Sequence, residues 1–199
     1  YMGAGMVRDY LKQTGRDVQE GAEILKTVPG LYSSSIEYAD SPVSQNLRDV
    51  ARIHLADLGV KVFYAQHGGY DTHANEYSGH EKLMIDLNRA VKDFFADLEE
   101  HDAADNVIMM IWSEFGRRVV DNGSGTDHGA GGGAFIIGNR VNGGLYSEYP
   151  SIEPSRTDNG DLAFQYDFRG LYSSVIDQWF NLDSPSIVGG TFEQLSLIK

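Results

Sequence analysis

Three short polar clusters could carry chemistry in this chain. They span residues 68–73, 113–118 and 126–129, and their reactive members are Asp71, His73, Glu114, Arg117, Arg118, Asp127 and His128. Imidazoles and carboxylates are the usual ligands of catalytic zinc and manganese, and guanidinium groups bind oxyanions through paired donors. The three clusters together therefore predict a divalent metal centre that acts on an anionic group.

The metal ligands predicted from the sequence come from two of these clusters. Asp71 and His73 stand two residues apart, so both side chains can point the same way from an extended or turning backbone. His128 would complete a mixed oxygen and nitrogen site with open positions, which is typical of catalytic zinc or manganese. Asp127 is expected to bind the metal directly or to orient an imidazole.

The middle cluster supplies the predicted catalytic groups, Glu114 and Arg117. Glu114 is expected to assist at the metal, and Arg117 is expected to hold the anion. Each cluster also has a plain structural interpretation: Asp71 can cap a turn, Glu114 and Arg117 can pair with each other, and His128 can lie exposed in a Gly-rich loop. For one cluster alone the structural interpretation is the stronger, so the functional interpretation depends on all three meeting at one edge of a sheet.

Hydrophobic spacing predicts the elements that would position the clusters. Apolar residues at helical spacing predict helices over 1–30, 44–59, 78–98 and 167–182. Short apolar runs predict strands over 60–65, 106–112 and 134–138. The Gly-rich stretches 116–133 and 139–166 are expected to be loops.

The order of these elements predicts how the clusters meet. Strand, helix and strand in succession form a βαβ unit with parallel strands, so both strands end on the same side of the sheet. That arrangement would place Asp71 and His73 beside Glu114 and Arg117. The strand at 134–138 follows without a crossover helix and is expected to run antiparallel to its predecessor. The predicted fold class is α/β, a mostly parallel sheet flanked by helices with one antiparallel strand.

Composition narrows the function classes. The 199 residues suffice for one domain or a large part of one. The formal net charge of −13 argues against nucleic-acid binding, which needs a basic face. No apolar run approaches the ~18 residues of a membrane span. The absence of cysteine excludes thiolate ligands and disulfides. Because the chain begins with Tyr1 rather than Met, it is expected to be a fragment whose leader, if any, is not visible.

Several strings of the sequence resemble the bacterial family called domain of unknown function 1501. They lie in order between residues 40 and 183, at 68–75, 94–98, 112–118, 122–129, 143–146 and 167–169. Members of that family resemble the alkaline phosphatase and sulfatase superfamily, and many carry a twin-arginine export signal. The resemblance implies a periplasmic or otherwise exported protein with an alkaline-phosphatase-like fold. Residues 1–199 would be a single α/β domain of it, or the C-terminal part of a larger one.

The resemblance also implies roles for particular residues. Asp71 and His73 resemble the superfamily's first pair of metal ligands, and His128 resembles a histidine in its Gly-rich loop. Glu114 and Phe115 stand where the superfamily has an Asp-His pair, and Phe115 cannot bind a metal. The resemblance therefore implies one intact metal site and an impaired second one. The superfamily's nucleophile comes from the N-terminal half, and the only hydroxyls inside the clusters are Thr72, Ser113 and Thr126.

Residues and resemblance together predict an exported metal-dependent hydrolase of phosphate or sulfate esters. Its cofactor would be zinc, manganese or calcium, and its substrate a small anionic ester. An alternative is a non-catalytic exported binding or assembly protein that retains the fold, which Phe115 at a ligand position favours. A third is a metal-dependent phosphomutase or transferase, whose product would form without incorporation of water.

Overall fold

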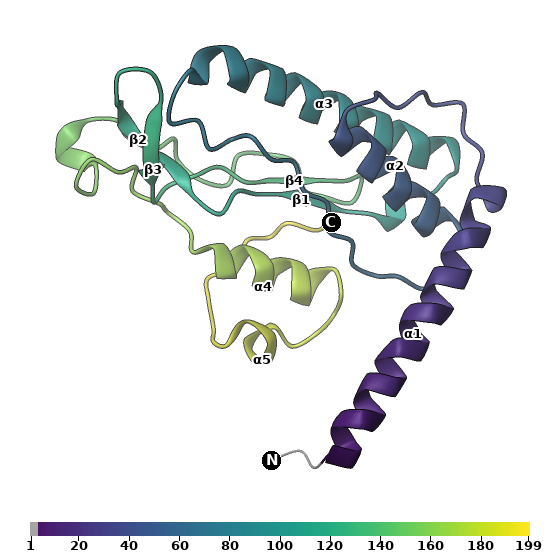
Figure 1. Ribbon diagram of the computed structural model, residues 1–199. Helices are drawn as coiled ribbons and strands as arrows, with labels where there is room; N and C mark the ends of the chain where they lie inside the picture. The colour runs from purple at the N-terminus through teal and green to yellow at the C-terminus, as the bar shows by residue number, and fades with distance from the viewer. Residues whose placement is uncertain (1–3) are drawn as a thin grey trace. The chain divides into compact units, whose positions relative to one another are not determined.

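The computed structural model describes residues 4–199, which form two compact units (Figure 1). The first unit contains the chain up to His67 together with Met84–Ala103. The second contains Gly68–Leu83 together with Ala104–Lys199. None of the helices formed by the described residues has the length and apolarity needed to cross a membrane.

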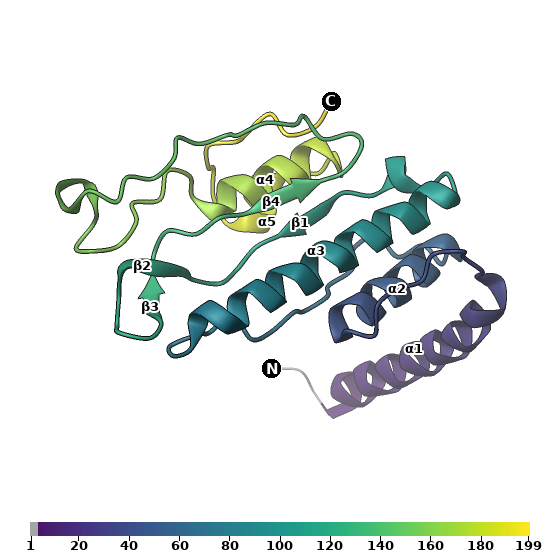
Figure 2. The same ribbon diagram turned by 90° about the horizontal axis from the view of Figure 1, so that it is seen from above.

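The first unit is helical. It contains α1 (Ala4–Leu31), α2 (Pro42–Leu55) and the greater part of α3 (Glu76–Glu100), and α2 lies beside the second half of α3 (Figure 2). The helix α2 begins where Ser41 caps it, because the Ser41 hydroxyl accepts a hydrogen bond from the backbone N–H of Ser44. The buried apolar side chains recur at helical spacing, as expected for helices that share a core. They are Val43, Leu47, Ala51, Ala90, Phe94, Leu98 and Ala103.

A buried carboxylate joins the segment before α2 to α3. Asp97 is fully buried, and its Oδ2 accepts hydrogen bonds from the hydroxyls of Tyr32 at 2.6 Å and Tyr38 at 2.7 Å. His101 Nδ1 lies 3.3 Å from Asp97 Oδ1. Burial and the hydrogen bond to Asp97 raise the pKa of Tyr32 to about 12, so its hydroxyl stays protonated as a donor. These partners offset the cost of burying the charge.

His101 follows the C-terminal end of α3 and faces acceptors with both ring nitrogens. Nδ1 lies 2.8 Å from the carbonyl oxygen of Asp97, and Nε2 lies 2.9 Å from that of Ser33. Both nitrogens donate only in the imidazolium form. The Asp97 carbonyl, then the Ser33 carbonyl and the Asp97 carboxylate, raise the pKa of His101 above its usual value. The C-terminal end of a helix also favours a positive charge.

We expect this imidazolium to make stability depend on pH. Because the pKa is higher in the folded chain, the stabilisation is complete below about pH 6.5 and is lost as the pH rises through the raised value. Urea unfolding as a function of pH should show wild type losing about 1 kcal/mol relative to His101→Gln over that window. His54→Gln is the control with opposite sign, because burial lowers the pKa of His54. Parallel profiles for wild type and His101→Gln would contradict this expectation.

The second unit contains two small antiparallel sheets. The strand β1 (Met109–Ile111) pairs with β4 (Phe135–Ile137), with Met110 opposite Ile136. The strand β2 (Gly116–Asp121) pairs with β3 (Thr126–Gly129). The other elements are the 3-10 turns η1 (Ala104–Asn106) and η2 (Pro154–Arg156) and the helices α4 (Phe168–Gln178) and α5 (Ser184–Val188).

The predicted fold class is wrong. Both sheets have two strands and both are antiparallel, so residues 4–199 contain no mostly parallel sheet and no alkaline-phosphatase-like core. The strand predicted over 60–65 does not form, and residues 58–72 are neither helix nor strand. Alternating apolar side chains suit a pleated surface, but a strand also needs a ladder partner. Of the residues predicted to form a strand over 106–112, only those of β1 do so, and β1 pairs with β4 rather than with residues 60–65.

Other sequence predictions are confirmed with shifted ends. Helices occupy most of the ranges predicted at 44–59, 78–98 and 167–182, and β4 runs antiparallel to β1 as expected. The first predicted helix is α1, and its residues 1–3 lie outside the described part of the chain. The stretch 116–133, predicted to be a loop, contains the hairpin of β2 and β3.

Candidate metal centre

A segment of residues 70–76 lies along the β2–β3 hairpin. The backbone N–H of Thr126 donates to the carbonyl oxygen of Thr72, and the N–H of Glu76 donates to the carbonyl oxygen of Ser124, at 3.3 and 3.2 Å. The hydroxyl of Thr126 also donates to Glu76 Oε2 at 2.8 Å. These bonds place Asp71 and His73 beside the strand that carries Asp127 and His128.

The hairpin turn is built by Asn122 and Gly123. The Asn122 side-chain oxygen accepts from the N–H groups of Ser124 and Gly125, and the Asn122 N–H donates to the Gly125 carbonyl oxygen. Gly123 has a φ of 106°, in the region that favours glycine. The chain therefore reverses here, and β3 returns with His128 opposite Arg117.

Asp71, His73 and His128 bring three ligand atoms together. Asp71 Oδ1 lies 2.7 Å from His128 Nε2 and 2.9 Å from His73 Nε2, and the two Nε2 atoms are 3.2 Å apart. Ligand atoms bound at about 2.1 Å lie about 3.4 Å apart in a tetrahedral zinc site and about 3 Å apart in an octahedral site. The observed triangle has the dimensions of one face of such a coordination shell.

The chemistry of these donors fits a cation. His73 Nδ1 faces Asp127 Oδ1 at 3.3 Å, so the tautomer with its proton on Nδ1 donates to this carboxylate and has a lone pair on Nε2. That lone pair points at the Nε2 of His128 and at the Asp71 carboxylate. Electron-rich atoms this close repel one another unless a proton or a metal ion lies between them. The residues therefore fit a divalent metal bound by Asp71, His73 and His128.

Asp127 supports His73 rather than joining the triangle. Its Oδ1 accepts from Asn122 Nδ2 at 3.2 Å as well as facing His73 Nδ1, and Asn122 Nδ2 also donates to the His73 carbonyl oxygen. The Asn122 hydrogen bond, followed by that of His73, lowers the pKa of Asp127. The His128 hydrogen bond, then the charges of His73 and Arg117, lower the pKa of Asp71. Both groups are carboxylates near neutral pH.

Arg117 is held by acceptors of the protein. Its guanidinium donates to the carbonyl oxygens of Thr126 and Tyr70 and lies 3.3 Å from Asp71 Oδ1. Arg117 does not pair with Glu114 as the structural interpretation has it. This geometry favours a role in positioning the Asp71 carboxylate over the predicted role in holding an anion.

Phe115 is a contributor that sequence reasoning missed. Its ring stacks on the imidazole of His128 with centroids 3.7 Å apart and planes 9° from parallel, and the Arg117 guanidinium lies over its ring. The sequence suggested only that Phe115 had replaced a ligand. The Asn122-Gly123 pair, a strong hairpin signal, could have placed Phe115 next to His128.

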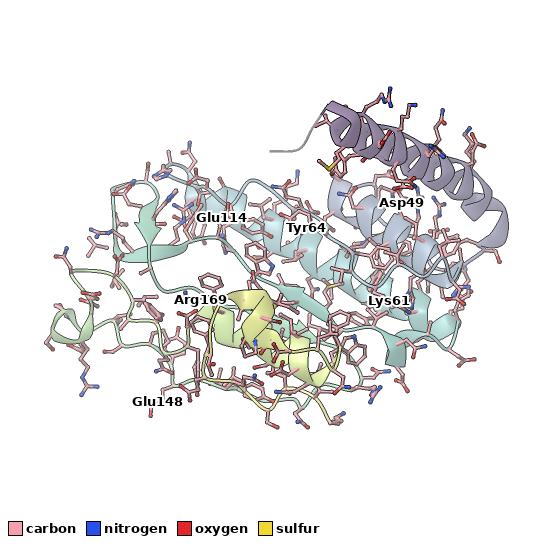
Figure 3. All side chains as sticks on the ribbon, turned by 90° about the horizontal axis from the view of Figure 1, so that it is seen from below. Asp49, Lys61, Tyr64, Glu114, Glu148 and Arg169 are labelled. Carbon is pink, nitrogen blue, oxygen red and sulfur yellow. The ribbon has the colours of Figure 1, made fainter. Side chains whose placement is uncertain are left out.

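The remaining predicted groups lie outside the triangle. Glu114 is exposed on the stretch between β1 and β2 and has no side-chain hydrogen bond or ion pair within residues 4–199 (Figure 3). Arg118 Nε lies 3.4 Å from Asp161 Oδ1. The Thr72 hydroxyl donates to the Tyr70 carbonyl oxygen and that of Thr126 donates to Glu76, so neither is directed at the ligand atoms.

Asp127→Asn is expected to weaken metal binding by about 10–100-fold, because the amide no longer fixes the His73 tautomer through a charged acceptor. Calorimetric titration with zinc or manganese would measure the change. Asp158→Asn is the matched control, since the exposed Asp158 carboxylate has no side-chain contact within the described chain. Equal affinities for Asp127→Asn and wild type would show that Asp127 does not position His73.

Comparison with known proteins identifies a family but no function. A family model described as protein of unknown function (DUF1501) matches residues 11–186. No curated protein and no solved structure matches the chain. The resemblance to the alkaline phosphatase and sulfatase superfamily is not supported by these comparisons. Since the matched region covers most of its length, the chain belongs to the DUF1501 family of proteins of unknown function.

Proposed function

We propose that the protein binds a divalent metal ion through Asp71, His73 and His128 and uses it to hydrolyse a phosphate or sulfate ester. The observation that supports this most directly is the triangle of one carboxylate oxygen and two imidazole nitrogens, with sides of 2.7, 2.9 and 3.2 Å. Two imidazoles favour zinc or manganese over calcium, which prefers oxygen ligands.

The exposure of the ligands supports a catalytic over a structural metal. The side chains of Asp71, His73 and His128 are 58, 49 and 46% exposed, so the outer face of the triangle is open to solvent. Structural zinc sites are closed by four protein ligands, whereas catalytic sites keep a position for water or substrate. A divalent cation bound here would lower the pKa of a water molecule and polarise the ester.

The surrounding residues would keep the ligands in place during turnover. Asp127 accepts the Nδ1 proton of His73 and so directs its Nε2 lone pair into the triangle. Phe115 holds the ring plane of His128 by stacking, and Arg117 holds the Asp71 carboxylate. Ligands fixed in this way need little rearrangement when a substrate binds.

Metal content and hydrolysis test this proposal together. Elemental analysis of protein dialysed against zinc or manganese should find stoichiometric metal in wild type and a large loss in Asp71→Ala. Hydrolysis of aryl phosphates or aryl sulfates should stop with a chelator and return when metal is added. Absence of bound metal, together with unchanged esterase activity in Asp71→Ala, would refute the proposal.

A second candidate is a non-catalytic binding or assembly protein that retains the metal. It is favoured by the engagement of Arg117 with protein acceptors and by the lack of contacts at Glu114. Stoichiometric metal without turnover of any aryl phosphate or sulfate would support it, and chelator-sensitive turnover would exclude it. Export of the protein stays a prediction of the family resemblance.

A further inference from the structure

One cleft is formed by residues of the first unit alone, and the proposed metal ligands are not among them. It has a volume of about 500 Å³ and is lined by residues 36–40, by Arg48 of α2 and by Arg89 of α3. Clefts of roughly 300–1,000 Å³ are typical of small-molecule sites. None of its lining residues belongs to the metal centre.

Arg48 has no partner for its charge. Its side chain is partly buried, and its Nε is buried without a hydrogen-bond acceptor. Among the side chains that the structure describes, no carboxylate forms an ion pair with Arg48. The terminal nitrogens of Arg48 also form no hydrogen bond with the described residues, so the guanidinium has donors to spare.

Arg89 brings a second guanidinium to the same cleft. Its ion pair with Asp93 is long, at 3.8 Å, and the Arg89 side chain is 62% exposed. Glu37 and Asp40 also line the cleft, but both are exposed and neither forms an ion pair with Arg48 or Arg89 in the described chain. Two guanidiniums with spare donors therefore face one cleft in a chain of net charge −13.

We propose that Arg48 and Arg89 bind the oxyanion group of a small molecule in this cleft. Guanidinium groups match the geometry of carboxylate and phosphate oxygens, so two of them at one cleft suit an oxyanion. An oxyanion in the cleft would accept hydrogen bonds from the terminal nitrogens of Arg48, which form none with the described residues. The cleft shares no residue with the metal centre, so an experiment can refute one proposal without refuting the other.

Nuclear magnetic resonance of the full chain tests this proposal with two probes, inorganic phosphate and acetate, at constant ionic strength. The side-chain Nε–H signal of Arg48, assigned by its loss in Arg48→Lys, should shift and saturate with at least one anion. Arg89→Gln should weaken that binding by about tenfold or more. Arg48→Gln should weaken it similarly, followed there by the side-chain Nε–H signal of Arg89. Arg16→Gln, on the exposed part of α1, is the matched control and should leave the affinity unchanged.

The two probes separate the sources of the oxyanion, since saturation by one alone identifies phosphate or carboxylate as the preferred group. No saturable shift with either anion up to about 10 mM would overturn the proposal. Equal affinity in wild type and Arg89→Gln would also overturn it, and this comparison holds even if Arg48→Gln does not fold. Metal content should be the same in all of these variants.

Discussion

Replacing Asp97 with alanine is expected to lower the free energy of unfolding by about 3–5 kcal/mol, the cost of removing one partner from a buried charged network. The variant would leave the hydroxyls of Tyr32 and Tyr38 without their shared acceptor and would remove the carboxylate that lies 3.3 Å from His101, whose ring nitrogens keep their backbone acceptors. Both hydroxyls would then be partly buried without their main partner. Urea unfolding of wild type and Asp97→Ala at pH 6 would measure the loss.

Removing one tyrosine hydroxyl at a time would show how much each hydrogen bond to Asp97 contributes to the free energy of unfolding. Tyr32→Phe and Tyr38→Phe should each cost about 1–2 kcal/mol, because each removes one hydrogen bond to a charged acceptor. Tyr77→Phe is the matched control, since Tyr77 is 95% exposed and should be neutral. An Asp97→Ala variant as stable as wild type would show that the network does not hold residues 32–38 on α3.

Gly125→Ala should reduce metal affinity by about 100-fold although residue 125 is not a ligand. A Cβ at this position would overlap the Thr72 carbonyl oxygen and lie 2.5 Å from the carbonyl carbon of His73. The clash is with backbone, which cannot rotate away, so residues 72 and 73 must move off the hairpin. His73 Nε2 would then leave the triangle that it forms with Asp71 and His128.

A matched glycine substitution makes this prediction specific. Gly133→Ala should bind metal as wild type does, because a Cβ at Gly133 meets no atom within 4 Å. Calorimetric titration with zinc would compare the three proteins, and circular dichroism would show whether the fold persists. Unchanged affinity in Gly125→Ala would mean that the contact between the hairpin and residues 72–73 does not shape the site.

The helices could be predicted from the sequence because their signals are local. Apolar residues at helical spacing mark the buried faces of α2 and α3, and Asp167, where the helix predicted over 167–182 starts, is the N-cap of α4. Its carboxylate accepts the backbone N–H of Arg169 at 2.9 Å and the Arg169 side chain, which together lower the pKa of Asp167 to about 2. Such signals depend only on residues that are close together in the sequence.

The sheets could not be predicted from the same kind of signal. Residues 60–65 have the composition of a strand, but composition does not name a partner, and β1 pairs with a strand about 25 residues further along the chain. The glycines of 116–133 favour a loop by composition, yet this stretch contains the hairpin of β2 and β3. Asn122-Gly123 between polar and β-branched residues was the signal of a turn.

The candidate ligands were found by residue type, while the geometry that joins them was predicted wrongly. Parallel strand ends were expected to bring the clusters together, yet a hairpin and the segment beside it do so. Glu114 follows the end of a predicted strand, and its side chain forms no hydrogen bond or ion pair with the described residues. Phe115 and Asn122 were missed because their contribution lies in orienting His128 and Asp127.

The ligand triangle joins parts of the chain that are far apart in sequence, since Asp71 and His128 are separated by 57 residues. An ion held by both would act as a reversible cross-link, and closing so long a loop removes much of the freedom of the unfolded chain. Because only the folded chain presents the three donors together, occupancy would raise the melting temperature with metal concentration. Metal supply would then set how long the stretch around Thr72 survives attack by proteases.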